Sequence, residues 1–324
     1  MIERKFEKMD VNTKKIIKQI IIVVLVAFLS VLGYYVYITA KNLSLINEHS
    51  KGEIPLDTSK PTNILILGTD RRTKNEAGRS DVMILVHLDP VNKKVTLLSI
   101  PRDSRVLVPG HGYDKINSSF NSDYFDDGGV DLSIKTVANL LGIDSKDIPY
   151  YVIVNFEGFA KVIDAIGGVT IDVKEPMHYH SWAGDVKIDL NPGVQHLDGV
   201  KALEYARFRY DQWGDFGVDE EGNIHGRVER QQELIKAIID QTKDIRNIFK
   251  LPQIAQEIGN AVDTNLTVAQ ITKIGLTYKD LTSKDLQIVN FPGVPQMIDG
   301  ISYVVPNYDK LKEIGATYFK LSNQ

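Results

Sequence analysis

The chain has 324 residues, of which 43% are hydrophobic and 25% charged, with a formal net charge of −4 and no cysteine. That length allows one large domain or two smaller ones, and the hydrophobic fraction supports a buried core. The absence of cysteine excludes disulfides, zinc–thiolate sites and thiol nucleophiles, and a pI near 6.0 argues against a nucleic-acid partner.

The first forty residues predict a membrane anchor. Residues 20–38 are apolar apart from a serine, a glycine and three tyrosines, and as a helix they reach about 28 Å, one hydrocarbon core. Lysine and arginine outnumber acidic residues before this segment, which places the N-terminus in the cytoplasm. A cleaved signal peptide is the alternative, but its apolar region would normally be shorter. We expect a cytoplasmic tail over 1–18, an uncleaved transmembrane signal-anchor over 19–40 and an extracytoplasmic stalk over 41–60.

The rest of the chain, residues 61–324, alternates short apolar runs with amphipathic segments. Apolar runs bounded by turn residues predict buried strands, and apolar residues spaced by three and four predict helices. The expected strands are Thr62–Gly68, Asp81–Leu88, Val95–Ile100, Tyr150–Val154, Val169–Val173, Leu286–Phe291 and Ser302–Val305. The expected helices are Val130–Leu141, Phe156–Ile166, Gly199–Ala206, Arg227–Ile248 and Tyr308–Phe319. This interleaving favours an α/β sandwich with a central mixed β-sheet.

Arginine is concentrated in four short segments that predict a phosphate-binding site. Nine of the ten arginines after the expected anchor lie in them: Arg71, Arg72 and Arg79; Arg102 and Arg105; Arg207 and Arg209; Arg227 and Arg230. Three of the segments follow strand-like or helical runs, where α/β sheets place ligands. The planar guanidinium donates two parallel hydrogen bonds to phosphate. On the last segment Arg227, Arg230 and Gln231 share one helix face. The alternative for each arginine is a surface ion pair.

Two aspartates border the first arginine segment. Asp70 ends the first expected strand and Asp81 begins the second. Two carboxylates can hold Mg²⁺ when phosphate oxygens complete its coordination shell. A salt bridge to a neighbouring arginine is the alternative for each of them.

Other reactive patterns are weaker. His178 and His180 alternate as metal ligands can, but no third ligand is evident and an exposed loop is the simpler interpretation. Ser118 and Ser119 lack the G-x-S-x-G setting of a hydrolase nucleophile. The chain also lacks the G-x-x-x-x-G-K-[ST] loop of P-loop nucleotide hydrolases.

Several sequence blocks carry a resemblance to a known family. They are NILILGTDRR, GRSDVMILVHLDP, LLSIPRDSRV, YDKINSSF, YYVIVNFEGFAKVIDAIGGV, LDGVKALEYARFR and GRVERQQ, in that order. With these blocks the chain resembles the LytR–CpsA–Psr family of cell-wall polymer ligases over about residues 61–245. The C-terminal strands are expected to complete the same domain.

The resemblance implies an extracytoplasmic α/β/α domain over residues 61–324 that binds a polyprenyl-pyrophosphate-linked glycopolymer. It implies transfer of the phosphoglycan (a teichoic acid, a capsule polysaccharide or another secondary polymer) to a sugar hydroxyl of peptidoglycan. It further implies that a phosphodiester forms with the assistance of Mg²⁺, for which Mn²⁺ can substitute. The general base and the polymer are left open.

The resemblance also suggests roles for individual residues. Asp70 and Asp81 match the metal-associated aspartates, and the candidate catalytic residues are Arg102, Arg207, Arg209 and Arg227. The candidate pyrophosphate contacts are Arg71, Arg79, Lys115, Asn117, Arg230 and Gln231.

One segment departs from the family pattern. Relatives usually run from an acidic-Phe-Gly block straight into the arginine of the next helix, whereas here VDEEGNIH separates Gly217 from Gly226. This insertion leaves the roles of Asp215 and Asp219 open.

Two alternative functions use the same sequence features. A polyprenyl-pyrophosphatase would use the same residues with water as acceptor, and a non-catalytic membrane regulator or polyanion receptor would only bind. A DNA-binding regulator would need a basic cytoplasmic module, which an eighteen-residue tail is too short to form.

The strands also predict a site for the lipid. Ile64, Ile66, Ile84 and Val86 are apolar, and a polyprenyl chain loses about 0.8 kcal/mol for each CH₂ left in water. We expect an elongated apolar tunnel between sheet and helices that opens at the Arg102 and Arg207 loops. A closed core is the alternative.

Overall fold

The computed structural model describes residues 54–69, 71, 76, 78–181, 187–221, 223–242, 262–278 and 280–321. The expected cytoplasmic tail and anchor, and residues 41–53 of the expected stalk, lie outside these ranges. Within the described ranges no helix combines the length and the hydropathy needed to cross a bilayer.

A six-stranded mixed sheet forms the centre of the molecule, as the sequence predicted. It consists of β1 (Thr62–Thr69), β2 (Ser80–Asp89), β3 (Lys94–Ser99), β6 (Tyr150–Asn155), β13 (Val262–Thr264) and β14 (Leu286–Val289). Their order is β13-β6-β1-β2-β3-β14. The pairs β1–β6 and β3–β14 are parallel, and the other pairs are antiparallel.

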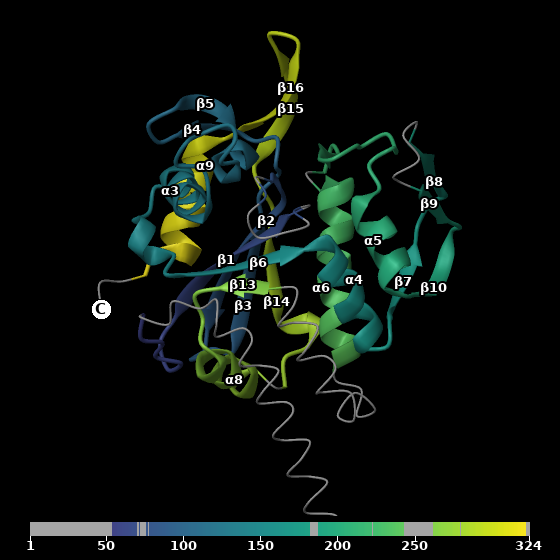
Figure 1. Cartoon of the computed structure of the whole chain (residues 1–324), viewed down its shortest axis with the longest axis horizontal. Coiled ribbons are helices and arrows are strands. Elements are labelled where there is room, and N and C mark those ends of the chain that lie inside the picture. The colour runs from purple at the N-terminus through teal and green to yellow at the C-terminus, as the bar shows by residue number, and fades with distance from the viewer. Residues whose placement is uncertain are drawn as a thin grey trace, which may run out of the picture.

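Helices cover both faces of this sheet (Figure 1). Alternate strand residues point to opposite faces, so Leu65 and Leu67 face one layer, and Ile64 faces the other. The first layer contains α3 (Val130–Leu141), α9 (Tyr308–Ile314) and the π-helical turn η5 (Gly315–Phe319). The second contains α6 (Arg227–Thr242) and α8 (Val268–Thr277). The arrangement is therefore an α/β/α sandwich.

A further unit packs on the outer side of α6. It consists of α4 (Phe156–Ala165), α5 (Gly199–Arg207), β7 (Val169–Val173), β8 (Met177–His180), β9 (Lys187–Leu190) and β10 (Gly193–Leu197). These elements bury their own hydrophobic cluster, which includes Ile163, Tyr205 and Leu234 of α6. Strands β7 and β10 pair with each other, as do β8 and β9, and neither pair joins the central sheet.

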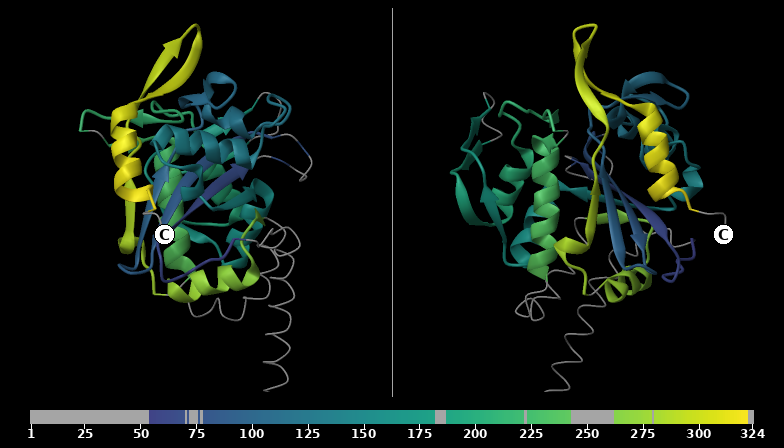
Figure 2. Two further views of the ribbon diagram at one scale, coloured as in Figure 1. Left: turned by 90° about the vertical axis from the view of Figure 1, so that its left-hand side faces the viewer. Right: turned by 180° about the vertical axis from the view of Figure 1, so that it is seen from behind.

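Three small hairpins gather at the end of the sheet where β2 begins. They are β4 (Arg105–Val108) with β5 (Gly112–Lys115), β11 (Gly217–Val218) with β12 (Ile224–His225), and β15 (Gly293–Ile298) with β16 (Ile301–Pro306). The Val304 amide donates to the Asp103 carbonyl at 2.9 Å, which ties β16 to the loop after β3. The β15–β16 hairpin projects from the body in all three views (Figure 1, Figure 2). Short 3₁₀ turns η1 (Ile116–Phe120), η2 (Ser145–Asp147) and η4 (Ser283–Asp285) complete the described elements.

The expected strands and helices are present, with small differences at their ends. The closing helix changes to π-helical hydrogen bonding after Ile314. Residues 243–248 of the expected helix Arg227–Ile248 lie outside the described residues. The expected strand Leu286–Phe291 ends at Val289, because Phe291 turns into the core.

Candidate functional site

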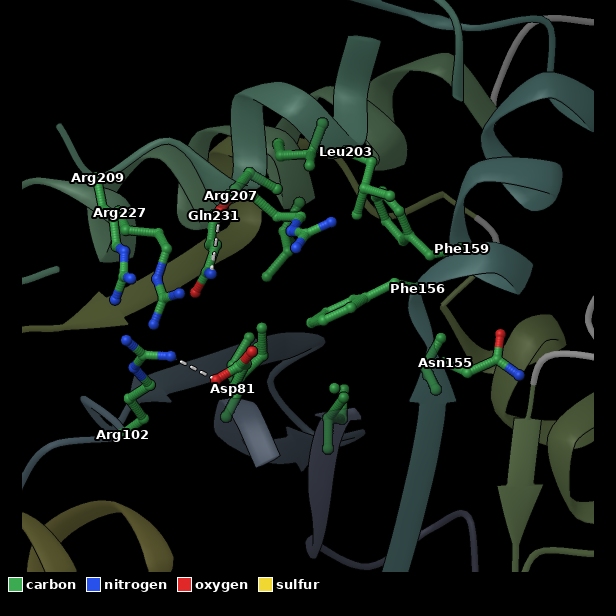
Figure 3. A pocket seen from close by; sticks show the side chains of 18 of the residues that line it. Asp81, Arg102, Asn155, Phe156, Phe159, Leu203, Arg207, Arg209, Arg227 and Gln231 are labelled. Carbon is green, nitrogen blue, oxygen red and sulfur yellow. Dashed lines mark hydrogen bonds and ion pairs between the residues drawn. The ribbon is translucent and has the colours of Figure 1, made fainter. Parts of the chain in front are cut away.

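A cavity of about 320 Å³ lies between the second face of the sheet and helices α4, α5 and α6. Most of its wall is apolar and comes from Ile66, Val82, Ile84, Val154, Phe156, Phe159, Leu203, Leu234, Ile235 and Ile238. Its polar end is formed by Asp81, Arg102, Arg207, Arg209, Arg227 and Gln231. A cavity between sheet and helices is thus present where the elongated apolar tunnel was expected, and Arg102 and Arg207 are among the residues that line it (Figure 3). That it accommodates a lipid chain stays a prediction.

Local capping interactions position the helices of this wall. The Asn155 side chain accepts a hydrogen bond from the Gly158 amide at 2.7 Å, so β6 ends and α4 begins at the cavity. This turn directs the Phe156 ring into the cavity, where the Arg207 guanidinium lies 5.7 Å from the ring centroid. Asp198 caps α5 in the same way through the Lys201 amide, and Arg207 is the last residue of that helix.

Asp215 is the centre of the ion-pair network at the polar end. Its carboxylate lies 2.9 Å from Nη2 of Arg102, 3.1 Å from Nε of Arg227 and 3.7 Å from Nη1 of Arg209. Arg102 also donates through Nη1 to Oδ1 of Asp81 at 2.6 Å. These contacts hold three guanidinium groups, from three different segments of the chain, at one end of the cavity.

Burial and charge act in opposite directions on these groups. Burial raises the pKa of Asp215, but Arg227, Arg102 and Arg209 outweigh it and hold that pKa below its usual value. Burial lowers the pKa of Arg102, but the opposite effect of Asp215 and Asp81 is larger, so the pKa is raised above its usual value. For Arg227, which is 7% exposed, burial prevails over Asp215 and the pKa is lowered. Arg227 is therefore a buried cation that Asp215 compensates only in part.

The polar end keeps an excess of positive charge. The side chains of Arg102, Arg207, Arg209, Arg227 and Lys115 gather near those of Asp81, Asp103 and Asp215. Arg207 lines the cavity and has no ion pair with a described carboxylate. A site with more guanidinium than carboxylate groups, at the end of an apolar cavity, suits an amphiphile with a multiply charged anionic head.

The predicted site residues divide into two groups. Asp81, Arg102, Arg207, Arg209, Arg227 and Gln231 line the cavity. The remaining described candidates, Arg71, Arg79, Lys115, Asn117 and Arg230, do not line it. Asp70 lies outside the described residues.

Each of the second group has a different environment. Arg71 stacks over Phe120 at 4.7 Å, and Arg79 is exposed. Lys115 pairs with Asp103 at 2.6 Å, and Asn117 is buried with 6% exposure.

The Arg230 side chain is buried and is bound by groups of the protein itself. Its guanidinium donates to Asp211 at 2.6 Å and to the Phe208 carbonyl at 2.7 Å. Only 6% of its side chain is exposed. Arg230 therefore fixes the segment that carries Arg209 to helix α6.

The inserted segment forms the β11–β12 hairpin and leaves the arginine network intact. The Arg227 amide donates to the Gly214 carbonyl at 3.1 Å, so both ends of the insertion return to the same point. Within the hairpin, His225 contacts Asp219 through Nε2 at 2.9 Å and Glu229 through Nδ1 at 3.1 Å. Asp215 belongs to the site, whereas Asp219 holds the hairpin.

A metal ion would have few protein ligands here. No cluster of three or more His, Cys, Asp or Glu side chains suited to a metal occurs among the described residues. His178 instead pairs with Asp189 at 2.9 Å on the surface. Asp81 is the carboxylate among the described residues that line the cavity, which fits Mg²⁺ held by one or two carboxylates and phosphate.

Comparisons with known proteins show the family of the chain. A model of the LytR_cpsA_psr family matches residues 32–320. The chain is 32% identical over 323 residues to the polyisoprenyl-teichoic acid–peptidoglycan teichoic acid transferase TagV of Bacillus subtilis (strain 168). That match covers 94% of this chain and 78% of the relative.

Two solved structures are similar in fold. The crystal structure of B. subtilis TagV has a TM-score of 0.64 and 34% identity, and covers 79% of this chain and 96% of its own. The structure of TagT with bound octaprenyl pyrophosphate lipid has a TM-score of 0.57 and 28% identity, and covers 83% of this chain and 94% of its own.

Proposed function

Because the chain belongs to the LytR_cpsA_psr family, we propose that it is a membrane-anchored phosphotransferase of the cell wall. It transfers a phosphoglycan such as a teichoic acid from a polyprenyl-pyrophosphate carrier to a sugar hydroxyl of peptidoglycan. The observation that supports this most directly is a cavity with an apolar length and an arginine-rich end. The octaprenyl pyrophosphate in the related TagT structure has the same two chemical parts.

The chemistry follows from the arginine network. Phosphoryl transfer depends mainly on positioning and on neutralising charge. In the free protein Arg102, Arg209 and Arg227 gather around Asp215, and the pyrophosphate would compete with this carboxylate for their guanidinium groups. The acceptor hydroxyl gives up its proton to a general base or to solvent, and its oxygen forms a bond to the phosphorus attached to the glycan. The bond from that phosphorus to the bridging oxygen breaks, and polyprenyl phosphate leaves with the charge that the arginines stabilise.

Mg²⁺ belongs to this proposal as the assisting ion, with Mn²⁺ as a substitute. Asp81 and Asp70 would hold it, and when bound it would neutralise phosphate charge. In support of this, Asp81 lies beside Arg102 and lines the cavity at its arginine-rich end (Figure 3).

The position of the chain's entry into the fold suits a membrane anchor. The Ile54 carbonyl accepts from Nε2 of Gln270 at 2.7 Å, and that of Pro55 accepts from the Tyr150 hydroxyl at 3.0 Å. Tyr150 pairs with Ile64 at the start of β1, whereas Asp81 follows the residue that pairs with Thr69 at its far end. The excess of Lys and Arg before residue 20 supports an N-terminus in the cytoplasm and a domain outside. The entry of the chain at Ile54 supports an arginine-rich end that faces away from the membrane.

Product analysis tests the proposal. The full chain in lipid nanodiscs is incubated with a polyprenyl-pyrophosphate-linked glycan, with and without peptidoglycan oligomers. We expect polyprenyl phosphate and a glycan–peptidoglycan phosphodiester to form together only when the oligomers are present. Formation of polyprenyl phosphate at the same rate without oligomers would instead indicate a pyrophosphatase. Binding of the lipid-linked glycan without turnover would indicate a receptor.

A further inference from the structure

An aromatic pair borders the arginine-rich end of the cavity. Tyr210 lines the cavity and is 42% exposed. Its ring stacks on Tyr179 of β8 with centroids 3.4 Å apart and an angle of 10° between the ring planes. The Phe208 ring contacts it edge-on at 6.0 Å, and the Arg209 guanidinium lies 5.7 Å from its centroid. The Tyr210 ring is thus held in place beside a cation of the site.

If the proposed function is correct, the position of Tyr210 indicates which part of the donor lies beside it. The lipid chain belongs in the apolar part of the cavity and the phosphates belong at the arginines. The group that follows the second phosphate must therefore lie at the mouth, next to Arg209. In the donor that group is a pyranose, whose axial C–H groups form an apolar face. A flat aromatic ring offers a large contact area to such a face at a small cost in side-chain entropy.

We propose that Tyr210, supported by Tyr179, stacks against the first sugar of the lipid-linked donor. This inference rests on the proposed function and adds a specificity-determining residue to it. Tyr210 contacts the sugar, whereas Tyr179 is a positioning residue that fixes the ring plane. The competing explanation is that the pair only fastens the β8–β9 hairpin to the segment after α5.

Binding of two lipids separates these explanations. The full chain in nanodiscs is titrated with polyprenyl pyrophosphate and with the same lipid bearing one N-acetylhexosamine. Tyr210→Ala should weaken the sugar-bearing lipid about tenfold relative to the sugar-free lipid, whereas Tyr210→Phe keeps the ring and should retain the preference for the sugar-bearing lipid. Tyr179→Ala should lose part of the same preference, and Tyr179→Phe should restore it. The control is Tyr113→Ala, because Tyr113 is 56% exposed and stacks on Arg105 outside the cavity.

Further outcomes decide between this inference and the proposed function. Tyr210→Leu keeps apolar bulk without a flat ring, so a thermal-melting midpoint close to that of wild type, with loss of the sugar preference, supports stacking. Equal weakening of both lipids by Tyr210→Ala, or no weakening of either, overturns the inference while the proposed function stands. If the wild-type chain binds neither lipid, the proposed function fails as well.

Discussion

Replacing Asp215 with asparagine should lower the melting midpoint of the free protein. It should also increase the rise in that midpoint when inorganic pyrophosphate is added. The wild-type carboxylate lies within 3.7 Å of three guanidinium groups. Without its charge, Arg227 loses its partner at 3.1 Å, whereas Arg102 keeps Asp81 at 2.6 Å. The variant therefore keeps one unpaired cation in a position where only 9% of its side chain is exposed.

The expected size of this effect follows from the burial. Removing one partner of a buried ion pair costs about 3–5 kcal/mol, because the other charge is left uncompensated. Asp215 is 20% exposed and Arg102 remains paired, so we expect the lower end, about 3 kcal/mol. For a domain of this size that corresponds to a fall of about 6–12 °C in the melting midpoint. Because the pKa of Asp215 is lowered, its contribution is present above the pKa of an unfolded aspartate and is lost in acid.

Thermal melting at neutral pH, with and without inorganic pyrophosphate, measures both effects. Pyrophosphate should raise the midpoint more in Asp215→Asn than in wild type, because it no longer competes with the carboxylate for the arginines. The control is Asp172→Asn, which breaks an exposed ion pair with Lys174 and should change stability by about 1 kcal/mol at most. A midpoint like that of wild type, or a smaller response to pyrophosphate, would refute the assignment of Asp215.

Four other outcomes are expected from the same site. Arg207→Ala should lower the transfer rate by about 10²–10³, whereas Arg105→Ala, outside the cavity, should be near normal, and equal losses would contradict the assignment. Asp81→Asn should remove the Mg²⁺ dependence of turnover, and an unchanged dependence would exclude this ligand. Long-chain polyprenyl phosphate should bind more tightly than a short-chain analogue in detergent-free titration, and equal affinities would exclude a lipid tunnel. The hydrogen bond to Asp219 raises the pKa of His225 despite its partial burial. Its contribution to stability is therefore complete below about pH 6.5 and is lost as the pH rises through the folded pKa. Denaturant unfolding of wild type and His225→Gln at several pH values measures this loss.

The central elements could be predicted because their local signals agree with their environment. The bounds of α3 match the expected helix, which ends where Gly142 takes φ 64° and the backbone turns. The strands β1, β2 and β3 are buried on both faces, so they appear as continuous apolar runs.

Strand β15 and helix α8 were not among the elements predicted from the sequence. The residues of β15 are mostly exposed and include Pro295, so neither apolarity nor β-propensity marks them. Helix α8 had a readable signal in the capping box between Thr267 and Gln270, where each side chain accepts from the other's backbone amide.

The site was predictable where arginine clustering carried the information and not where pairing decided it. Helical spacing places Arg227 and Arg230 on one face, yet Arg227 lines the cavity whereas Arg230 is bound to Asp211. Only the fold reveals which of two neighbouring arginines has a local partner. Asp215 was left open for a similar reason, because the insertion separates it in sequence from the arginine that it contacts.

The two ends of helix α6 lie at opposite ends of the central sheet. Helix α6 begins with Arg227 at the arginine-rich end, and its Asp240 accepts a hydrogen bond from Ser283 at the end of the sheet where β14 starts. The same end receives the chain at Ile54. In the proposed function the apolar part of the cavity holds the lipid chain and the arginine-rich end holds the phosphates, so the acceptor must reach the arginine-rich end. The β11–β12 insertion begins and ends there, because the Arg227 amide donates to the Gly214 carbonyl, and β16 is tied to the loop of Arg102 through the Val304 amide and the Asp103 carbonyl. We therefore expect sequence changes in these two hairpins to alter the choice of acceptor without changing lipid affinity.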